Sequence, residues 1–174
     1  MTIEPAHKLE HINEYYFSTK LKQIAQLRAQ GKPIINLGIG NPDQAPSVQT
    51  IEALKLAASN VNNQGYQSYV GIPALRKAMC NWYKNTYGVD LNPENEILPL
   101  LGSKEGISHI SSAFLNPGDK VLVPNPGYPT YTSATHLASA IPIYYELDEH
   151  NNWAPDFSSI DESILREAKI IWTN

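Results

Sequence analysis

The segment Gly102-Ser103-Lys104 combines three residue types that can hold a phosphate group. It lies where a short apolar run is expected to pass into a helix, and the first-turn amides of a helix lack intrahelical partners and favour anions. Gly102 lets the backbone approach a ligand, Ser103 adds a hydroxyl and Lys104 adds a positive charge. The alternative is a plain serine N-cap. A Walker loop is excluded, because the Gly-x-x-x-x-Gly-Lys spacing is absent.

Residues 125–129, Asn-Pro-Gly-Tyr-Pro, follow the next expected strand along the chain. Two prolines and a glycine restrict the backbone to an unusual path, which suits holding Tyr128 in one orientation. A rigid aromatic ring at the carboxyl edge of a sheet can stack on a planar ligand. The alternative is a surface turn that carries a packed tyrosine.

Two further segments are weaker signals on their own. Residues 38–43, Gly-Ile-Gly-Asn-Pro-Asp, place glycines at the end of an extended run, where Gly40 would let a substrate approach the main chain. The alternative there is a tight turn. Residues 65–76 place Tyr66 in a polar, glycine-flanked loop before a helix that Pro73 opens. Alone, this pattern predicts only a loop followed by a helix.

The other reactive side chains indicate structure rather than catalysis. Cys80 is the single cysteine, and its apolar helical context favours a buried thiol over a nucleophile. The histidines have no mutual metal-ligand spacing, so no metal site is expected. His109 and His136 lie in expected helices, where packing or exposure is the ordinary interpretation. Acidic residues near the carboxyl end are interpreted as solvated surface charge: Asp156, Asp161 and Glu162.

Composition is that of an ordinary globular protein, with 42% hydrophobic and 17% charged residues. The net charge of −4 and the scattered basic residues argue against a nucleic acid or an anionic membrane as partner. No apolar stretch approaches the ~20 residues of a membrane span. The polar amino terminus lacks the apolar core of a secretory signal. We therefore expect a cytoplasmic protein.

Hydrophobic periodicity places these segments on alternating helices and strands. Helices are expected over residues 14–30, 47–60, 73–88 and 103–115, and from Pro129 to about Ser139. Strands are expected over residues 97–101, 120–123, 141–145 and 169–172. The alternation predicts an α/β fold with parallel βαβ units in a covered sheet. Ligands of such sheets bind beyond the carboxyl ends of the strands, so the chain is expected to stop where a site would continue.

In this order, the four segments resemble the class I/II aminotransferases of the fold-type I pyridoxal-phosphate family. Residues 35–43 look like the family's substrate-entry segment. Tyr66 with residues 71–76 is similar to its Y-x(4)-G-x-x-x-L-R signature, and residues 102–106 fit its phosphate-binding turn. The Gly-Ser-Lys-Glu-Gly and Asn-Pro-Gly-Tyr-Pro-Thr-Tyr forms look most like the diaminopimelate/aspartate aminotransferase-like members. The resemblance spans about residues 10 to 174.

The resemblance implies amino-group transfer between an amino acid and a 2-oxo acid through pyridoxal phosphate, in amino-acid metabolism. Gly102, Ser103 and Lys104 would hold the cofactor phosphate, and Tyr128 would stack on the pyridine ring. In a homodimer, Tyr66 would reach the partner's cofactor phosphate. The backbone of Gly40 would meet the substrate carboxylate.

The fold implied is the parallel-rich three-layer sandwich of the fold-type I large domain, incomplete at the carboxyl end. Residues 1–44 would form an amino-terminal arm and the first piece of the small domain, and residues 45–174 the first half of the large domain. In the family's strand order, residues 97–101 would lack both neighbours, leaving open apolar edges. The resemblance also implies a cis Asn125–Pro126 peptide, since X-Pro bonds carry only ~0.5–1 kcal/mol of trans preference.

Three interpretations remain open for function. The first is an amino-terminal fragment of an aminotransferase, inactive alone, because the family's Schiff-base lysine lies beyond the position of Asn174. The second is a non-catalytic protein, either a fragment or a cofactor-free binding module. The third is a related fold-type I lyase or decarboxylase, which shares the four motifs.

We predict that the 174-residue chain alone catalyses no transamination and forms no specific covalent adduct with pyridoxal phosphate. None of its lysines follows a late strand in a small-residue context, and Lys104 is needed at the phosphate end of the cofactor. The measurement is borohydride reduction after addition of the cofactor, with mapping of labelled peptides. Stoichiometric labelling of one lysine, together with turnover, would contradict the prediction. Scattered labelling is expected of any exposed amine.

Overall fold

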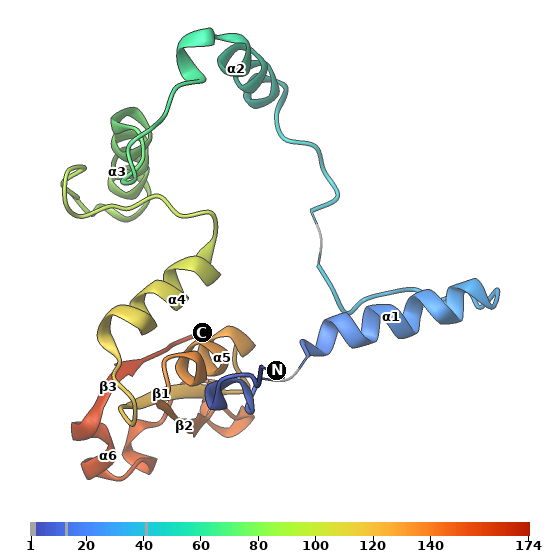
Figure 1. Cartoon of the computed structure of the whole chain (residues 1–174), viewed down its shortest axis with the longest axis vertical. Coiled ribbons are helices and arrows are strands. Elements are labelled where there is room, and N and C mark those ends of the chain that lie inside the picture. Colours follow the sequence, from blue (N-terminus) through green and yellow to red (C-terminus); the bar gives the residue numbers. More distant parts are fainter. Residues whose placement is uncertain (1–2, 13, 41) are drawn as a thin grey trace. The chain divides into compact units, whose positions relative to one another are not determined.

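The computed structural model describes residues 3–12, 14–40 and 42–174. The chain divides into two compact units. The first comprises Leu100–Asn174 with the amino-terminal residues through Tyr16, and it contains all the strands of the described chain. The second, Phe17–Pro99, is helical. Figure 1 shows the elements of each unit.

A three-stranded sheet in the order β2-β1-β3 is the centre of the first unit. β1 (Lys120–Asn125) pairs in parallel with β2 (Ile141–Glu146) and with β3 (Ala168–Ile171). The central strand is the most buried, and its residues Val121 to Pro124 are all buried. A parallel strand flanked on both sides has this pattern because both of its faces are covered. The predicted α/β class with a parallel sheet is confirmed.

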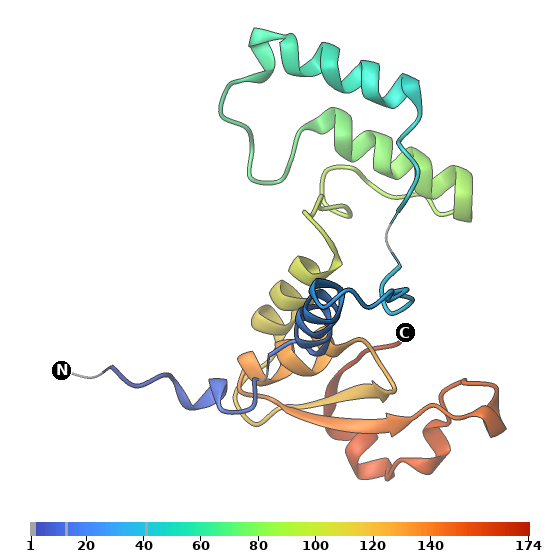
Figure 2. The same cartoon turned by 90° about the vertical axis from the view of Figure 1, so that its right-hand side faces the viewer.

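One face of the sheet is packed by helices of the same unit. α4 (Ser103–Phe114) packs on α5 (Pro129–Leu137), and α5 packs on β1 and β2 (Figure 2). The core between them consists of Leu115, Val121, Val123 and Ala140. Burial of a valine side chain stabilises a fold by about 1.5–3 kcal/mol. Alternation along β1 puts Leu122 on the other face. Tyr145 of β2 meets Phe157 of η4 (Phe157–Ser159), with ring centroids 5.6 Å apart.

Residues 97–101 are not a strand, and this prediction was wrong. Within the described chain the segment pairs with no other strand, and Leu101 is fully exposed. An apolar run has the side chains of a strand, but its backbone groups need a neighbouring ladder before a strand exists. The family's strand order implied that residues 97–101 lack both neighbouring strands. Without those neighbours the segment does not form a strand.

The second unit contains three helices, with the ends that the sequence predicted. α1 spans Tyr16–Ala29, α2 spans Val48–Ser59 and α3 spans Pro73–Tyr87, with η2 (Val61–Asn63) after α2. The Ser47 hydroxyl caps α2 by accepting the Thr50 amide at 3.2 Å. Gly88 ends α3 with a positive φ of 69°, which glycine adopts without strain.

The apolar face of α2 remains largely uncovered, and that of α1 is only half-buried. Neither helix has a buried residue, and Val48 and Leu54 are 70% and 69% exposed. α3 buries Arg76 and Cys80, which confirms the packed thiol. Amphipathic spacing thus predicted the helices correctly, but a spacing alone does not supply a partner for the apolar face.

Short helices complete the first unit: η1 (His7–Leu9), η3 (Glu149–Asn151) and α6 (Glu162–Glu167). The sequence interpretation had not predicted α6. Asp161 caps it by accepting the Ser163 amide at 2.7 Å, and Asp156 caps η4 by accepting the Ser158 amide at 2.9 Å. The Ser158 and Ser163 hydroxyls donate to the same carboxylates, and these hydrogen bonds, followed by those from the amides, lower the pKa of both exposed carboxyls. Both aspartates are on the surface as expected, but each also begins a helix. None of the helices described could span a membrane.

We predict that Asp119→Asn lowers the melting temperature more at pH 7 than at pH 3. The Asp119 carboxylate accepts Lys169 Nζ at 2.8 Å and the Asn116 amide at 2.6 Å, joining the turn before β1 to β3. The Lys169 hydrogen bond is the main cause of its lowered pKa. A lowered folded-state pKa contributes stability above the unfolded value of ~3.9, and this stability is lost as the pH falls through the folded value. Circular-dichroism melting at both pH values measures the difference.

Lys169→Met provides the matched partner variant. The double variant is expected to melt no lower than either single one, because only one interaction is removed. A melting difference of equal size at pH 7 and pH 3 would contradict the assignment to the Asp119 charge.

Candidate functional site

The amino terminus of α4 has the open amides that the sequence predicted. Ser103 is the first helical residue and Gly102 is the N-cap, so the alternative of a serine N-cap is wrong. Within the described residues, no acceptor contacts the amides of Gly102, Ser103 and Lys104. A Cβ built on Gly102 meets no atom within 4 Å, so there is space in front of these amides.

Glu105 lies in the same first turn, and its carboxylate is engaged by groups other than the open amides. Its Oε2 accepts the Leu101 amide at 2.6 Å, and its Oε1 lies 3.6 Å from His109 Nε2. A carboxylate held in this way satisfies a donor that precedes the helix. The three amides that follow remain available to an external anion.

The Lys104 ammonium joins two sequence motifs. It lies 5.6 Å from the centroid of the Tyr128 ring and 5.0 Å from that of Tyr15. Cation–π contacts of this kind contribute about 0.5–1 kcal/mol at exposed sites. The phosphate-binding motif and the ring-stacking motif are therefore neighbours in the first unit. The sequence interpretation did not identify Tyr15. Its position directly before α1 was the only feature that could have indicated it.

The turn between β1 and α5 controls the position of Tyr128. The Asn125–Pro126 peptide is cis, as predicted. A Cβ on Gly127 would lie 2.3 Å from the carbonyl oxygen of Pro124, so only glycine fits there. Tyr128 then caps α5 and is half-buried. This geometry brings a single aromatic ring from the end of the central strand toward Lys104.

Tyr66 and Gly40 belong to the second unit, whereas Lys104 and Tyr128 belong to the first. The Tyr66 side chain is fully exposed. A Cβ on Gly40 meets nothing within 4 Å, which leaves its backbone accessible. Asn41, in the same motif, lies outside the described residues. Their proposed roles stay predictions.

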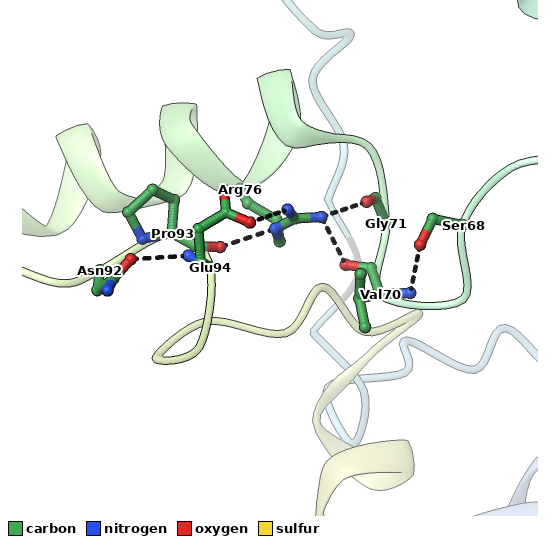
Figure 3. A network of polar contacts seen from close by, with 7 residues as sticks. All are labelled: Ser68, Val70, Gly71, Arg76, Asn92, Pro93 and Glu94. Carbon is green, nitrogen blue, oxygen red and sulfur yellow. Dashed lines mark hydrogen bonds and ion pairs between the residues drawn. The ribbon is translucent and has the colours of Figure 1, made fainter.

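Arg76, the last residue of the Y-x(4)-G-x-x-x-L-R signature, is buried and holds the loop that follows Tyr66 (Figure 3). Its Nη1 donates to the carbonyl of Gly71 at 2.5 Å, and its Nε donates to the carbonyl of Pro93 at 2.7 Å. Its Nη2 pairs with Glu94 at 3.3 Å. Planar guanidinium donors can serve several acceptors at once. This arginine therefore joins the loop at Gly71 to the segment after α3.

The histidines do not contribute to this site. The His11 ring contacts the His136 ring of α5, with centroids 5.1 Å apart and planes tilted by 31°, beside a cavity of about 460 Å³ whose lining also includes His7. Burial lowers the pKa of His136, and the neighbouring His11 lowers it further. His109 lies on the exposed side of α4. The sequence interpretation had not paired His11 with His136, because they come from segments far apart in the chain.

The residues of the first unit fit the phosphate and ring of pyridoxal phosphate. The open amides of α4 and the space beside Gly102 suit a phosphate, and Lys104 supplies a cation. The Tyr128 ring, whose centroid lies 5.6 Å from the Lys104 ammonium, could contact the pyridine ring of the same ligand.

Comparison with known proteins gives consistent results. The sequence profile of aminotransferase class I and II matches residues 32–174. An LL-diaminopimelate aminotransferase of Dehalococcoides mccartyi is 44% identical over 167 residues, which is 96% of this chain and 43% of that protein. One from Aquifex aeolicus is 42% identical, over 98% of this chain and 44% of its own. The chain thus spans less than half the length of these relatives.

Solved structures agree. The substrate-bound BacF structure from Bacillus subtilis superimposes with a TM-score of 0.90 and 37% identity, over 98% of this chain and 43% of its own. An alanine aminotransferase from Pyrococcus furiosus gives a TM-score of 0.79 and 30% identity, over 97% of this chain and 43% of its own.

We predict that Arg76→Lys destabilises the second unit. A lysine ammonium cannot reach the carbonyls of Gly71 and Pro93 together, and losing charged hydrogen bonds of about 1.5–3 kcal/mol each gives an expected cost of about 2–4 kcal/mol. Urea unfolding measures the loss, and hydrogen exchange at residues 70–76 locates it.

Glu94→Gln is the matched control. The Glu94 side chain is 72% exposed, so removing its charge is expected to cost less than about 1 kcal/mol. Equal destabilisation by the two variants would show that the ion pair, and not the carbonyl contacts, holds the loop.

Proposed function

The chain belongs to the aminotransferase class I and II family, and from this premise we propose that the whole protein is a pyridoxal-phosphate-dependent amino-acid aminotransferase. It would transfer an amino group between an amino acid and a 2-oxo acid. One observation carries the proposal for this chain. The Lys104 ammonium, at the open amino terminus of α4, contacts the ring of Tyr128.

The phosphate end of the cofactor would be held by Gly102, Ser103 and Lys104. Three amides without protein acceptors, a hydroxyl and an ammonium converge on one helix terminus, and each can donate to a phosphate oxygen. The Glu105 carboxylate is engaged by the Leu101 amide, which keeps it from occupying the open amides. This arrangement supports binding of a dianion without rearrangement of the helix.

The ring end would be set by Tyr128. When bound, pyridoxal phosphate supplies the electron sink that allows an amino acid to lose its α-proton. Tyr128 would stack on the pyridine plane and exclude water from one of its faces. The half-burial of Tyr128 and the tight turn at Gly127 support one fixed ring position.

A homodimer is the assembly we propose for the whole protein. Tyr66 would then contact the partner's cofactor phosphate, and the backbone of Gly40 would meet the substrate carboxylate. The complete exposure of Tyr66, the uncovered apolar face of α2 and the half-buried one of α1 support a covering surface outside this chain. In this arrangement residues 1–44 form the arm and the first piece of the small domain, and residues 45–174 belong to the large domain.

The relatives suggest the first substrate to test. Proteins named LL-diaminopimelate aminotransferase are 40–44% identical to this chain, and we propose that amino acid as the amino donor. A cytoplasmic location is proposed with it.

We predict that the chain binds pyridoxine 5′-phosphate, which has no aldehyde and cannot react with lysine, at least about ten-fold more tightly than pyridoxine. Charged hydrogen bonds of about 1.5–3 kcal/mol account for the difference. Calorimetric titration measures both ligands. Equal affinities would contradict the phosphate cradle.

Two variants locate the binding. Gly102→Val is expected to abolish the phosphate-dependent gain while α4 stays folded, because a Cβ there meets no protein atom and the φ of 168° suits any residue. Lys104→Met is expected to weaken binding and its salt dependence. Lys77→Met, on the exposed part of α3, is the charge-matched control and should bind like the unaltered chain.

A further inference from the structure

Tyr131 contacts Tyr128 on one side and the end of β3 on the other. Its ring meets the Tyr128 ring edge-on, with centroids 5.7 Å apart and planes at 82°. Its opposite surface lies flat on Trp172, at 5.1 Å and 8°. Both geometries are favoured by the quadrupoles of aromatic rings. Tyr128, Tyr131 and Trp172 therefore form a continuous aromatic row, which we call the tyrosine row.

The far end of the tyrosine row is anchored by hydrogen bonds. The Tyr131 hydroxyl donates to the carbonyl of Thr173 at 3.2 Å, and the Tyr145 hydroxyl donates to the carbonyl of Trp172 at 2.6 Å. The fully buried Thr135 hydroxyl donates to the carbonyl of Tyr131 at 2.8 Å. Tyr131 is thus held through its ring, its hydroxyl and its backbone.

We infer that Tyr131 is a positioning residue that fixes the orientation of the Tyr128 ring for the cofactor. The inference rests on the proposed function, in which Tyr128 stacks on the pyridine. The face of Tyr128 is approached by Lys104 at 5.6 Å, and its neighbour along α5 is Tyr131. The flexible Lys104 side chain can follow movements of the ring, so its contact restrains the ring weakly. An edge-on ring that is itself held by Trp172 restrains it more strongly.

The consequence is a coupling between the end of β3 and the ring-binding residue. Trp172 and Thr173 follow β3, and Tyr128 follows β1, so the carboxyl ends of two neighbouring strands are linked through one side chain of α5. Loss of the Tyr131 ring is expected to leave the phosphate cradle at α4 unchanged, since Lys104 contacts Tyr128 and not Tyr131.

The test labels the full chain with 3-fluorotyrosine and records ¹⁹F spectra of its ten tyrosines. Tyr128→Phe assigns the Tyr128 line. Tyr131→Leu is expected to shift and broaden that line, whereas Tyr131→Phe, which keeps the ring contact, should leave it close to its original position. Tyr87→Leu removes a ring from the aromatic group on α3 and should not affect it.

Ligand binding separates this inference from the proposed function. Tyr131→Leu is expected to weaken pyridoxine 5′-phosphate binding about five-fold, as loss of an aromatic contact would, and to leave inorganic phosphate binding unchanged. Failure of the unaltered chain to bind pyridoxine 5′-phosphate would overturn the proposed function, while the Tyr128 line would still decide the role of Tyr131.

Two outcomes overturn the inference. The first is an unchanged Tyr128 line in folded Tyr131→Leu, and the second is unchanged pyridoxine 5′-phosphate affinity in that variant. If Tyr131→Leu does not fold, contacts between the rings of Tyr128 and Tyr131 are measured in the unaltered chain by nuclear Overhauser effects. Their presence supports the inference, and their absence overturns it.

Discussion

The parallel pairing of β1 with β2 and β3 is the interaction on which the first unit depends. It buries Val121 to Pro124 and brings the carboxyl ends of the strands to one edge. The turn at Gly127 and the residues after β3 both emerge at this edge. Tyr128 and Trp172 are therefore close enough to share Tyr131, although they are far apart in the chain. Without the pairing, neither aromatic residue would have a defined position.

Backbone groups near the start of α4 and near the start of α3 differ in whether they have a hydrogen-bond partner. At the start of α4, the amides of Gly102, Ser103 and Lys104 have no acceptor among the described residues. Near the start of α3, by contrast, backbone carbonyls are satisfied, because the Arg76 guanidinium donates to those of Gly71 and Pro93. Open donors suit an anionic ligand, whereas satisfied acceptors suit a rigid loop. One motif thus leaves donors open, and the other supports a loop.

The second unit has well-formed helices but little buried surface. Capping by Ser47 and termination at Gly88 depend on neighbouring residues only, so α2 and α3 begin and end where local chemistry places them. Full burial of the apolar faces of α1 and α2 requires another surface, and the described residues do not provide one. The chain matches relatives that are more than twice its length, and the covering surface we propose lies in the assembled protein.

Local chemistry in the sequence by itself determined the caps, the helix start at Ser103, the buried Cys80 and the order of motifs that indicates the family. The caps and the helix start depend on contacts within a few residues. The strand expected at residues 97–101 failed because a strand requires a hydrogen-bonded neighbour, which no property of the segment can supply. Tertiary structure alone brought Lys104 to Tyr128 and Tyr131 to Trp172, since these contacts join residues from different elements. Sequence spacing identifies the groups that can do chemistry, whereas the pairing of strands decides which of them meet.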